Sequence, residues 1–188
     1  MSENEKKEFP KWVALDGVIE WAKVFASNRD KRGPNDAYVG WDGATTVDML
    51  LSDGEYQKLK DAGSTLTGKK EGDNWRVKFK RRWVHRTSKG EEYPQYGGAP
   101  NVIRPDGTPW DLTEDGLIGN GSTGICHVQI YQSGSFLGTR LVGLQVRDHV
   151  AFESTGSGFS YPDLTQEGSP PKEEPKAKKQ MVDDEIPF

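Results

Sequence analysis

The most regular pattern of apolar and polar positions in the chain lies within residues 75–86. Trp75, Val77 and Phe79 alternate with cations, because every even-numbered position from 76 to 82 is Lys or Arg. Successive side chains of a strand point to opposite faces, so this pattern predicts a strand with one face in the core and a row of cations on the other. Arg81 interrupts the apolar face, and we expect a bulge or the end of the strand there.

Similar patterns predict further strands. Two extended segments, 11–15 and 18–25, are expected on either side of Asp16-Gly17, with Trp21 and Phe25 on one face of the second. In a strand within 137–152, Val150 is expected on the core face and Leu141 on the opposite face. Alternating apolar positions or turn residues at the boundaries predict the remaining strands, at 45–51, 101–104 and 123–132.

A single short helix is expected among these strands. Ser52 stands three residues before Glu55, as in a capping box, and the helix 53–62 would end at Gly63. One short helix among many strands indicates a mainly β fold rather than a doubly wound α/β fold.

Composition divides the chain into four parts. Residues 1–10 form a charged arm that we expect to be mobile, and residues 11–152 form the folded domain. Residues 153–180 are rich in Gly, Ser, Pro and Lys without a periodic apolar stripe, which predicts a disordered linker. Residues 181–188 are an acidic tip in which a carboxylate run precedes an apolar ending, and its candidate partner-binding residues are Asp183, Asp184, Glu185, Ile186, Pro187 and Phe188.

Charge is distributed unevenly along the chain. The net charge is −4, yet residues 69–89 contain nine Lys or Arg against two acidic residues. The local field decides where a polyanion docks, so this basic segment favours nucleic acid as a ligand despite the acidic total.

The chain is also rich in aromatic residues, with six Trp, six Tyr and seven Phe. Single-stranded nucleic acid is held by a cationic groove together with aromatic faces on which bases stack. Rings in loops and on outer faces are better candidates for stacking than rings on the core face. The candidate DNA-binding residues are Arg29, Lys31, Arg32, Tyr38, Trp41, Arg76, Lys78, Lys80, Arg82, Arg86, Tyr93, Tyr96, Trp110 and Tyr131.

Other function classes have weaker support. The single Cys126 excludes an intrachain disulfide and a cysteine-cluster zinc site. No apolar run approaches the about 20 residues that span a bilayer, and no signal-peptide pattern opens the chain, so we expect a soluble cytoplasmic protein. No catalytic residue, cofactor or metal is assigned, and we expect no enzyme. A carboxylate-rich loop leaves a metal-dependent nuclease as one alternative, through Asp106, Asp111, Glu114 and Asp115.

Two segments carry a resemblance to a known family. The tip, Asp183 to Phe188, is similar to the C-terminal tip of bacterial single-stranded DNA-binding proteins. Residues 115–123 (DGLIGNGST) and the order of predicted elements over residues 18–152 resemble the single-stranded DNA-binding proteins of tailed bacteriophages.

This resemblance implies a single OB (oligonucleotide-binding) fold, a five-stranded Greek-key barrel with one short helix and a disordered C-terminal tail. It implies a protein that coats single-stranded DNA largely independently of sequence during phage replication, recombination and repair, in the cytoplasm of the host cell. It also implies a homodimer, and a tip that recruits a DNA polymerase, helicase or primase. An RNA-binding OB-fold chaperone and a structural protein with an unrelated acidic tail remain alternatives.

Overall fold

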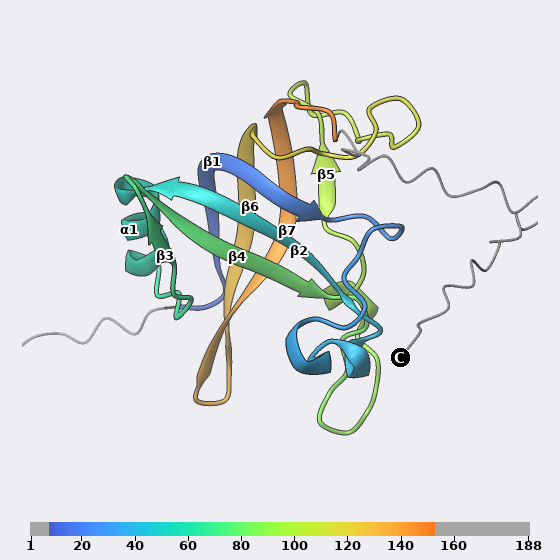
Figure 1. Ribbon diagram of the computed structural model, residues 1–188. Coiled ribbons are helices and arrows are strands. Elements are labelled where there is room, and N and C mark those ends of the chain that lie inside the picture. Colours follow the sequence, from blue (N-terminus) through green and yellow to red (C-terminus); the bar gives the residue numbers. More distant parts are fainter. Residues whose placement is uncertain (1–7, 153–188) are drawn as a thin grey trace, which may run out of the picture. The chain divides into compact units, whose positions relative to one another are not determined.

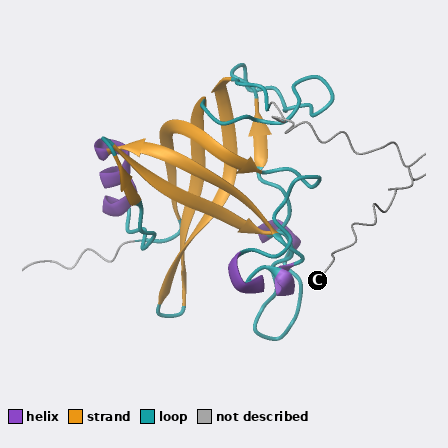
Figure 2. Ribbon diagram, viewed as in Figure 1, coloured by secondary structure: helices purple, strands orange, loops and turns teal. Residues whose placement is uncertain are grey.

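The computed structural model of the chain describes residues 8–152. Residues 1–7 and 153–188, which contain most of the predicted arm and the whole predicted linker and tip, lie outside the described residues. The described part is a mainly β structure with one α-helix and three single-turn 3-10 helices (Figure 2). In chain order its strands and α-helix are β1 (Lys11–Lys23), β2 (Ala44–Ser52), α1 (Asp53–Asp61), β3 (Lys69–Glu71), β4 (Asn74–Arg82), β5 (Asn101–Ile103), β6 (Ser122–Ser133) and β7 (Phe136–Asp148).

All seven strands belong to one curled sheet, in the order β3-β4-β2-β1-β6-β7-β5 (Figure 1). Every pair is antiparallel except β5 with β7. Among the described residues no backbone ladder joins β4 to β7, so the sheet is not closed. A side chain bridges this seam, because Arg81 of β4 donates to the carbonyl of Leu141 in β7 at 3.4 Å. The loop after α1 also contacts β7, where the Ser64 and Thr139 hydroxyls lie 2.7 Å apart.

The core fills the inside of this curl, and it confirms much of the predicted alternation. Val77 and Phe79 of β4 are buried, and Cys126, Val128 and Ile130 of β6 face inward as the period of two requires. The five long strands β1, β2, β4, β6 and β7 make up an OB-like fold, to which β3 and β5 add one short strand at each edge.

The predicted helix is present, with Ser52 as its N-cap. The Ser52 hydroxyl accepts a hydrogen bond from the Glu55 backbone N–H at 3.3 Å. The Glu55 carboxylate accepts from the backbone N–H of Asp16 in β1 at 3.0 Å, so the helix is tied to the sheet. Leu59 is buried beneath the helix, and the chain leaves it through Gly63.

The predicted break at Asp16-Gly17 is wrong, because β1 is one continuous strand. Its first part pairs with β6 and its second part pairs with β2, so hydrogen bonds continue through the Asp-Gly pair. Gly17 lies opposite Gly124, and a Cβ at Gly17 would stand 2.5 Å from the carbonyl oxygen of Leu50. This glycine pair allows the strand to coil where it exchanges partners.

The predicted faces of two strands are also wrong, because bulges shift them. An irregularity between Glu20 and Lys23 leaves Trp21 60% exposed while Phe25 is buried, so these rings do not share a face. A second irregularity, in the pairing of β6 with β7, places Leu141 in the core, while Val150 is exposed beyond the end of β7. Period-two reasoning fails where one strand gains an extra residue.

Candidate nucleic-acid interface

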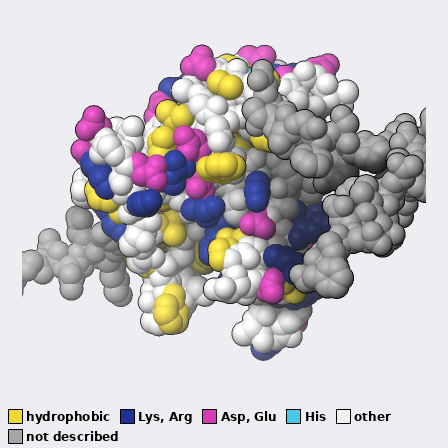
Figure 3. All heavy atoms as spheres, viewed as in Figure 1, with side chains coloured by type: hydrophobic (Ala, Val, Ile, Leu, Met, Phe, Trp, Pro, Cys, Tyr) yellow, Lys and Arg dark blue, Asp and Glu magenta, His cyan; other side chains and the backbone are white. Residues whose placement is uncertain are grey.

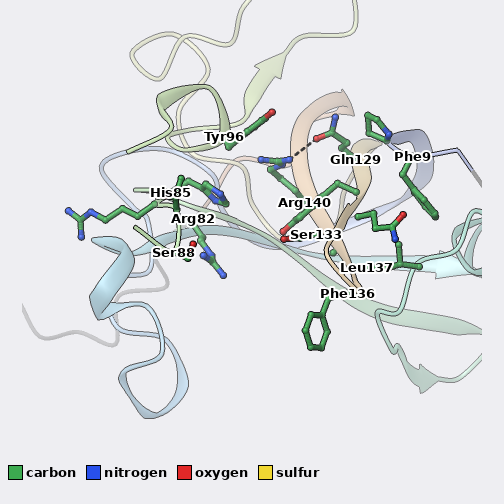
Figure 4. A pocket seen from close by; sticks show the side chains of 16 residues that line it. Phe9, Arg82, His85, Ser88, Tyr96, Gln129, Ser133, Phe136, Leu137 and Arg140 are labelled. Atoms are coloured by element: carbon green, nitrogen blue, oxygen red, sulfur yellow. Dashed lines mark hydrogen bonds between the residues drawn. The ribbon is translucent and has the colours of Figure 1, made fainter. Parts of the chain in front are cut away.

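A groove lies between the hairpin of β6 and β7 and the segment that follows β4. It consists of a cavity of about 750 Å³ and a smaller adjoining one of about 110 Å³, which share Arg82, His85, Tyr96, Tyr131 and Arg140 (Figure 4). No Asp or Glu of residues 8–152 lines either cavity. The cations that line them are Lys80, Arg81, Arg82, Arg86 and Arg140.

Arg140 of β7 is the most enclosed of these cations. It is only 9% exposed, and its guanidinium lies 4.2 Å from the ring centroid of Tyr96 and 4.6 Å from that of Tyr131. It donates a hydrogen bond to the side-chain oxygen of Gln129 at 2.8 Å (Figure 4). Burial lowers the pKa of Arg140, and a cation this deep in a low-dielectric site attracts an anion strongly.

Gly138 fixes the position of one of the two rings. A Cβ at this residue would lie 2.4 Å from the ring of Tyr131, so only glycine lets the ring lie over β7. The ring can therefore pack on the Arg140 guanidinium, two residues further along the strand.

Arg81 stands where the sequence predicted an interruption of the core pattern, and β4 ends at the next residue. Its guanidinium donates to the Gly97 carbonyl at 2.7 Å and to Leu141 across the open seam. Burial and the nearby charge of Arg140 lower its pKa. Arg81 therefore holds the seam together and adds positive potential to the groove.

Trp41 forms the other aromatic side of the groove. The Arg82 guanidinium lies 4.2 Å from its ring centroid and the Lys80 ammonium 5.5 Å from it. Tyr38 stacks on Trp41 at 5.3 Å but is itself 4% exposed, so Tyr38 supports the tryptophan from behind. A 3-10 turn, Val39–Trp41, and left-handed Asp42 give the chain the sharp bend that presents Trp41.

His85 lines both cavities of the groove. Burial lowers its pKa, and the charges of Arg82, Arg140 and Arg81 lower it further. Its ring meets the Tyr96 ring edge-on at 5.6 Å. The pKa of His85 therefore depends on the positive charges that surround it in the groove.

The cation row of β4 divides into two halves. In the paired half, Arg76 donates to Glu20 and, at 2.8 Å, to Glu71, and hydrogen bonds to Glu71 and Glu20 raise its pKa. Lys78 forms an ion pair with the buried Asp48 at 3.1 Å, although that Asp48 oxygen accepts no well-aligned hydrogen bond.

In the open half, Lys80 and Arg82 pair with no carboxylate of residues 8–152 and instead lie against Trp41. Arg86, four residues further on, lines the groove and pairs with Glu92 at 3.0 Å. Figure 3 shows the face that β4 crosses, with Asp and Glu side chains among the Lys and Arg side chains.

The remaining predicted residues lie outside the groove lining. Arg29 pairs with Asp42 at 3.2 Å and packs over the ring of Trp83, and Arg32 lies 3.9 Å from Asp36. Lys31 is exposed in the same loop. Their contact with DNA stays a prediction.

Two predicted aromatic residues also lie elsewhere. Tyr93 is 39% exposed beside Tyr96, and it lines a separate cavity of about 270 Å³. Trp110 is partly buried against the core, and its indole N–H donates to the Gly116 carbonyl at 3.0 Å.

The carboxylates of the acidic loop form ion pairs and hydrogen bonds with residues of the same segment. Glu114 and Asp115 both hold Arg104, at 2.7 and 2.8 Å. Asp106 accepts from Thr108, and Asp111 accepts from backbone N–H groups of the same turn. These carboxylates serve a turn and an ion pair, which does not favour the nuclease alternative.

Several groove residues were missed by the sequence analysis. Arg140 and Phe136 belong to β7, whose pattern was interpreted only as core and surface, and Phe136 is 78% exposed at the tip of the hairpin. The sequence predicts the interruption at Arg81 but gives no sign of its partner across the seam. Only the curl of the sheet brings β4 and β7 together, so their shared groove has no local sequence signal.

Together the fold and the groove define an OB-like β structure with a cationic, aromatic-lined groove. Among solved structures, the chain is similar to gp2.5, a single-stranded DNA-binding protein encoded by bacteriophage T7, with a TM-score of 0.50 and 14% identity, covering 88% of this chain and 100% of that one. It is also similar to the single-stranded DNA-binding protein of bacteriophage Enc34 in complex with ssDNA, with a TM-score of 0.48 and 10% identity, covering 74% and 87%.

The similarity to gp2.5 confirms, at the level of the fold, the resemblance to phage single-stranded DNA-binding proteins. No protein-family model matches the chain, and no curated protein sequence matches it significantly. Within residues 8–152, no helix has the length and apolar character required to cross a membrane.

Proposed function

We propose that this protein binds single-stranded DNA in the groove, largely independently of sequence. One observation carries the proposal: the cations of β4 and β7 converge without any carboxylate in the lining and lie against the rings of Trp41, Tyr96 and Tyr131. Neighbouring like charges repel each other unless a polyanion is present. Phosphates and base faces are common to all sequences, which suits these contacts.

The expected salt dependence follows from the number of groove cations. Arg86 already pairs with Glu92, which leaves four lining cations without a carboxylate partner among the described residues. If each of these four neutralises one phosphate, log K falls with log salt at a slope of about −2.8, since each contact with a single strand contributes about 0.7.

A titration of the full-length protein with poly(dT) at several salt concentrations tests this function. Binding is followed by tryptophan fluorescence, because a base stacked on Trp41 would quench its emission. Poly(U) in a parallel titration tests the RNA-binding alternative. This comparison is needed because the groove contacts require no sugar hydroxyl and so do not by themselves distinguish DNA from RNA. The proposal fails if the protein leaves the mobility of an unpaired oligonucleotide unchanged in dilute buffer.

We further propose that the acidic tip recruits replication or repair proteins, such as a DNA polymerase, helicase or primase. The support is the sequence of residues 181–188, in which three carboxylates precede Ile-Pro-Phe. A basic pocket on a partner would hold such an end. Deleting residues 181–188 should abolish capture of the partner and slightly tighten binding to DNA, because a tethered polyanion competes for the groove.

If truncation weakens DNA binding instead, this assignment of roles is overturned. The homodimer that the resemblance implies is a separate proposal, which light scattering of the purified protein tests.

A further inference from the structure

Trp12 is a second aromatic surface beside the groove. Its ring is 64% exposed on the outer face of β1, while its neighbour Val13 is buried. In the sheet Trp12 lies directly opposite Gln129 of β6, and Gln129 lies opposite Arg140 of β7. Directly opposite residues share a face, so the three side chains form one row that begins in the groove and ends at the tryptophan.

We propose that Trp12 is a base-stacking platform that extends the single-stranded DNA path beyond the groove. The strand would leave the groove over Arg140 and Gln129, cross β6, and place a base on the exposed indole. This inference rests on the proposed function, and it adds a stacking position outside the groove and a direction in which the strand leaves it.

The geometry of the sheet supports this path. Arg140 and Trp12 are separated by two strand spacings, about 10 Å, a distance that about two nucleotide steps of an extended strand cover. Phe9 and Pro10, which precede Trp12 closely in the chain, line the groove, so the start of β1 lies at the edge of the groove (Figure 4 labels Phe9).

Most residues beside this row have small side chains. The next row on the same face consists of Ala14, His127 and Gly143, two of which have little or no side chain. A sugar-phosphate backbone can therefore approach the sheet closely here.

Another exposed tryptophan on the same strand provides a matched control. Trp21 is 60% exposed, but it lies at the bulge of β1, where its backbone N–H donates to Asn120 at 2.7 Å. Neither tryptophan lines the groove itself, but Trp21, unlike Trp12, does not lie in the row that leads across Gln129 to Arg140. The two residues thus share type, strand and exposure, and they differ in their position relative to the groove.

The test compares Trp12→Ala, Trp12→Phe and Trp21→Ala in the full-length chain, with binding measured on labelled oligothymidylates. On an oligonucleotide long enough to leave the groove, Trp12→Ala should weaken binding about tenfold, because one stacked base is lost. Trp12→Phe should recover most of this loss, and Trp21→Ala should remain within about twofold of the unchanged protein. On an oligonucleotide that fills only the groove, all four proteins should bind equally.

Two outcomes overturn the inference. One is equal binding of Trp12→Ala and the unchanged protein to the longer oligonucleotide. The other is a Trp12→Ala protein whose mass in solution changes while its DNA affinity does not, which would make Trp12 a contact between protein copies. If Arg82→Gln weakens binding while Trp12→Ala does not, only this inference fails. If neither variant has an effect, the proposed function fails with it.

Discussion

The two halves of the β4 cation row contain the same kinds of residue in the same alternation, and yet they differ in what they can bind. In the paired half, Arg76 and Lys78 are engaged by carboxylates of β1, β2 and β3. In the open half, Lys80 and Arg82 lie against Trp41 and line the groove. A cation whose charge is already compensated gains little from a phosphate, because it must first give up its carboxylate.

The cross-strand partners explain the difference. On β2, Asp48 lies opposite Lys78, whereas Thr46 lies opposite Lys80 and Ala44 lies opposite Arg82. Opposite-charge pairs directly across two strands stabilise a sheet, so Asp48 makes the first half structural. The number of cations available to DNA is therefore overestimated from the sequence of one strand alone, unless the residues of the neighbouring strand are also known.

The largest expected effect comes from neutralising each half in turn. Lys80→Gln with Arg82→Gln should weaken binding to poly(dT) about 30- to 100-fold at low salt, because two charge-assisted contacts are lost. The salt slope should become shallower by about 1.4. The melting temperature should change little, since neither cation pairs with a carboxylate of the described residues. Titrations across salt concentration and thermal unfolding provide both measurements.

The matched control is Arg76→Gln with Lys78→Gln. It should leave DNA affinity within about threefold of the unchanged protein but lower the melting temperature by about 2–6 °C, because Asp48 and its neighbours lose their partners. Equal losses of affinity in the two double variants would remove the distinction between the halves.

A second prediction concerns how Arg140 acts. Arg140→Lys keeps the charge but loses the planar group that packs between Tyr96 and Tyr131. Affinity for single-stranded DNA should fall about tenfold with an unchanged salt slope, since the number of charges is the same. Arg147→Lys, on the same strand but exposed beside Asp16, is the control and should have no effect. A shallower slope for Arg140→Lys would contradict this explanation.

Local patterns were sufficient to predict most of the fold. The alternation of β4 and β6, the Ser52 cap of α1 and the short β5 all follow from neighbours in the sequence. The bulges at Trp21 and in β7 could not be predicted, because they depend on how β1 and β7 pair with other strands. The predicted break at Asp16-Gly17 is wrong for the same reason, because the neighbouring strands on both sides of β1 keep this pair extended.

The site was only partly predictable. The sequence predicted Trp41, Tyr96 and Tyr131 as stacking residues and the open half of β4 as a cationic surface. Both predictions follow from the sequence itself, because rings in loops and on outer faces and an alternating row of cations can be read there. It could not distinguish the open half from the paired half, since the carboxylates that pair with Arg76 come from three different strands. Nor could it find Arg140, whose role depends on a hairpin and a loop that meet only in the folded chain.

A third prediction concerns Asp48, whose substitution should free one cation of the paired half. Asp48→Asn removes the carboxylate opposite Lys78 with almost no change in shape, so the ammonium becomes available to a phosphate. Binding to poly(dT) should tighten about two- to fivefold, and the salt slope should steepen by about 0.7. Asp53→Asn, which releases Lys70 away from the row, should change neither value. An Asp48→Asn protein with unchanged affinity would show that Lys78 lies outside the DNA path.

The smallest expected effect is a dependence of affinity on pH through His85. In the free protein, burial and then the charges of Arg82, Arg140 and Arg81 hold the pKa of His85 below its ordinary value. Phosphates in the groove would offset those charges and raise the pKa, so the complex binds more protons than the free protein. Affinity should therefore increase as the pH falls through the range just below His85's ordinary pKa of about 6.5, by about two- to fourfold.

His85→Gln should remove this dependence, whereas His149→Gln, at the far end of β7 against Trp110, should keep it. The measurement is the dissociation constant of a labelled oligothymidylate at fixed ionic strength across this pH range. The rings of Tyr93 and Tyr96 also face His85. An unchanged pH profile in His85→Gln would place the DNA phosphates away from the three arginines, and would thereby locate the DNA path outside the open half of β4.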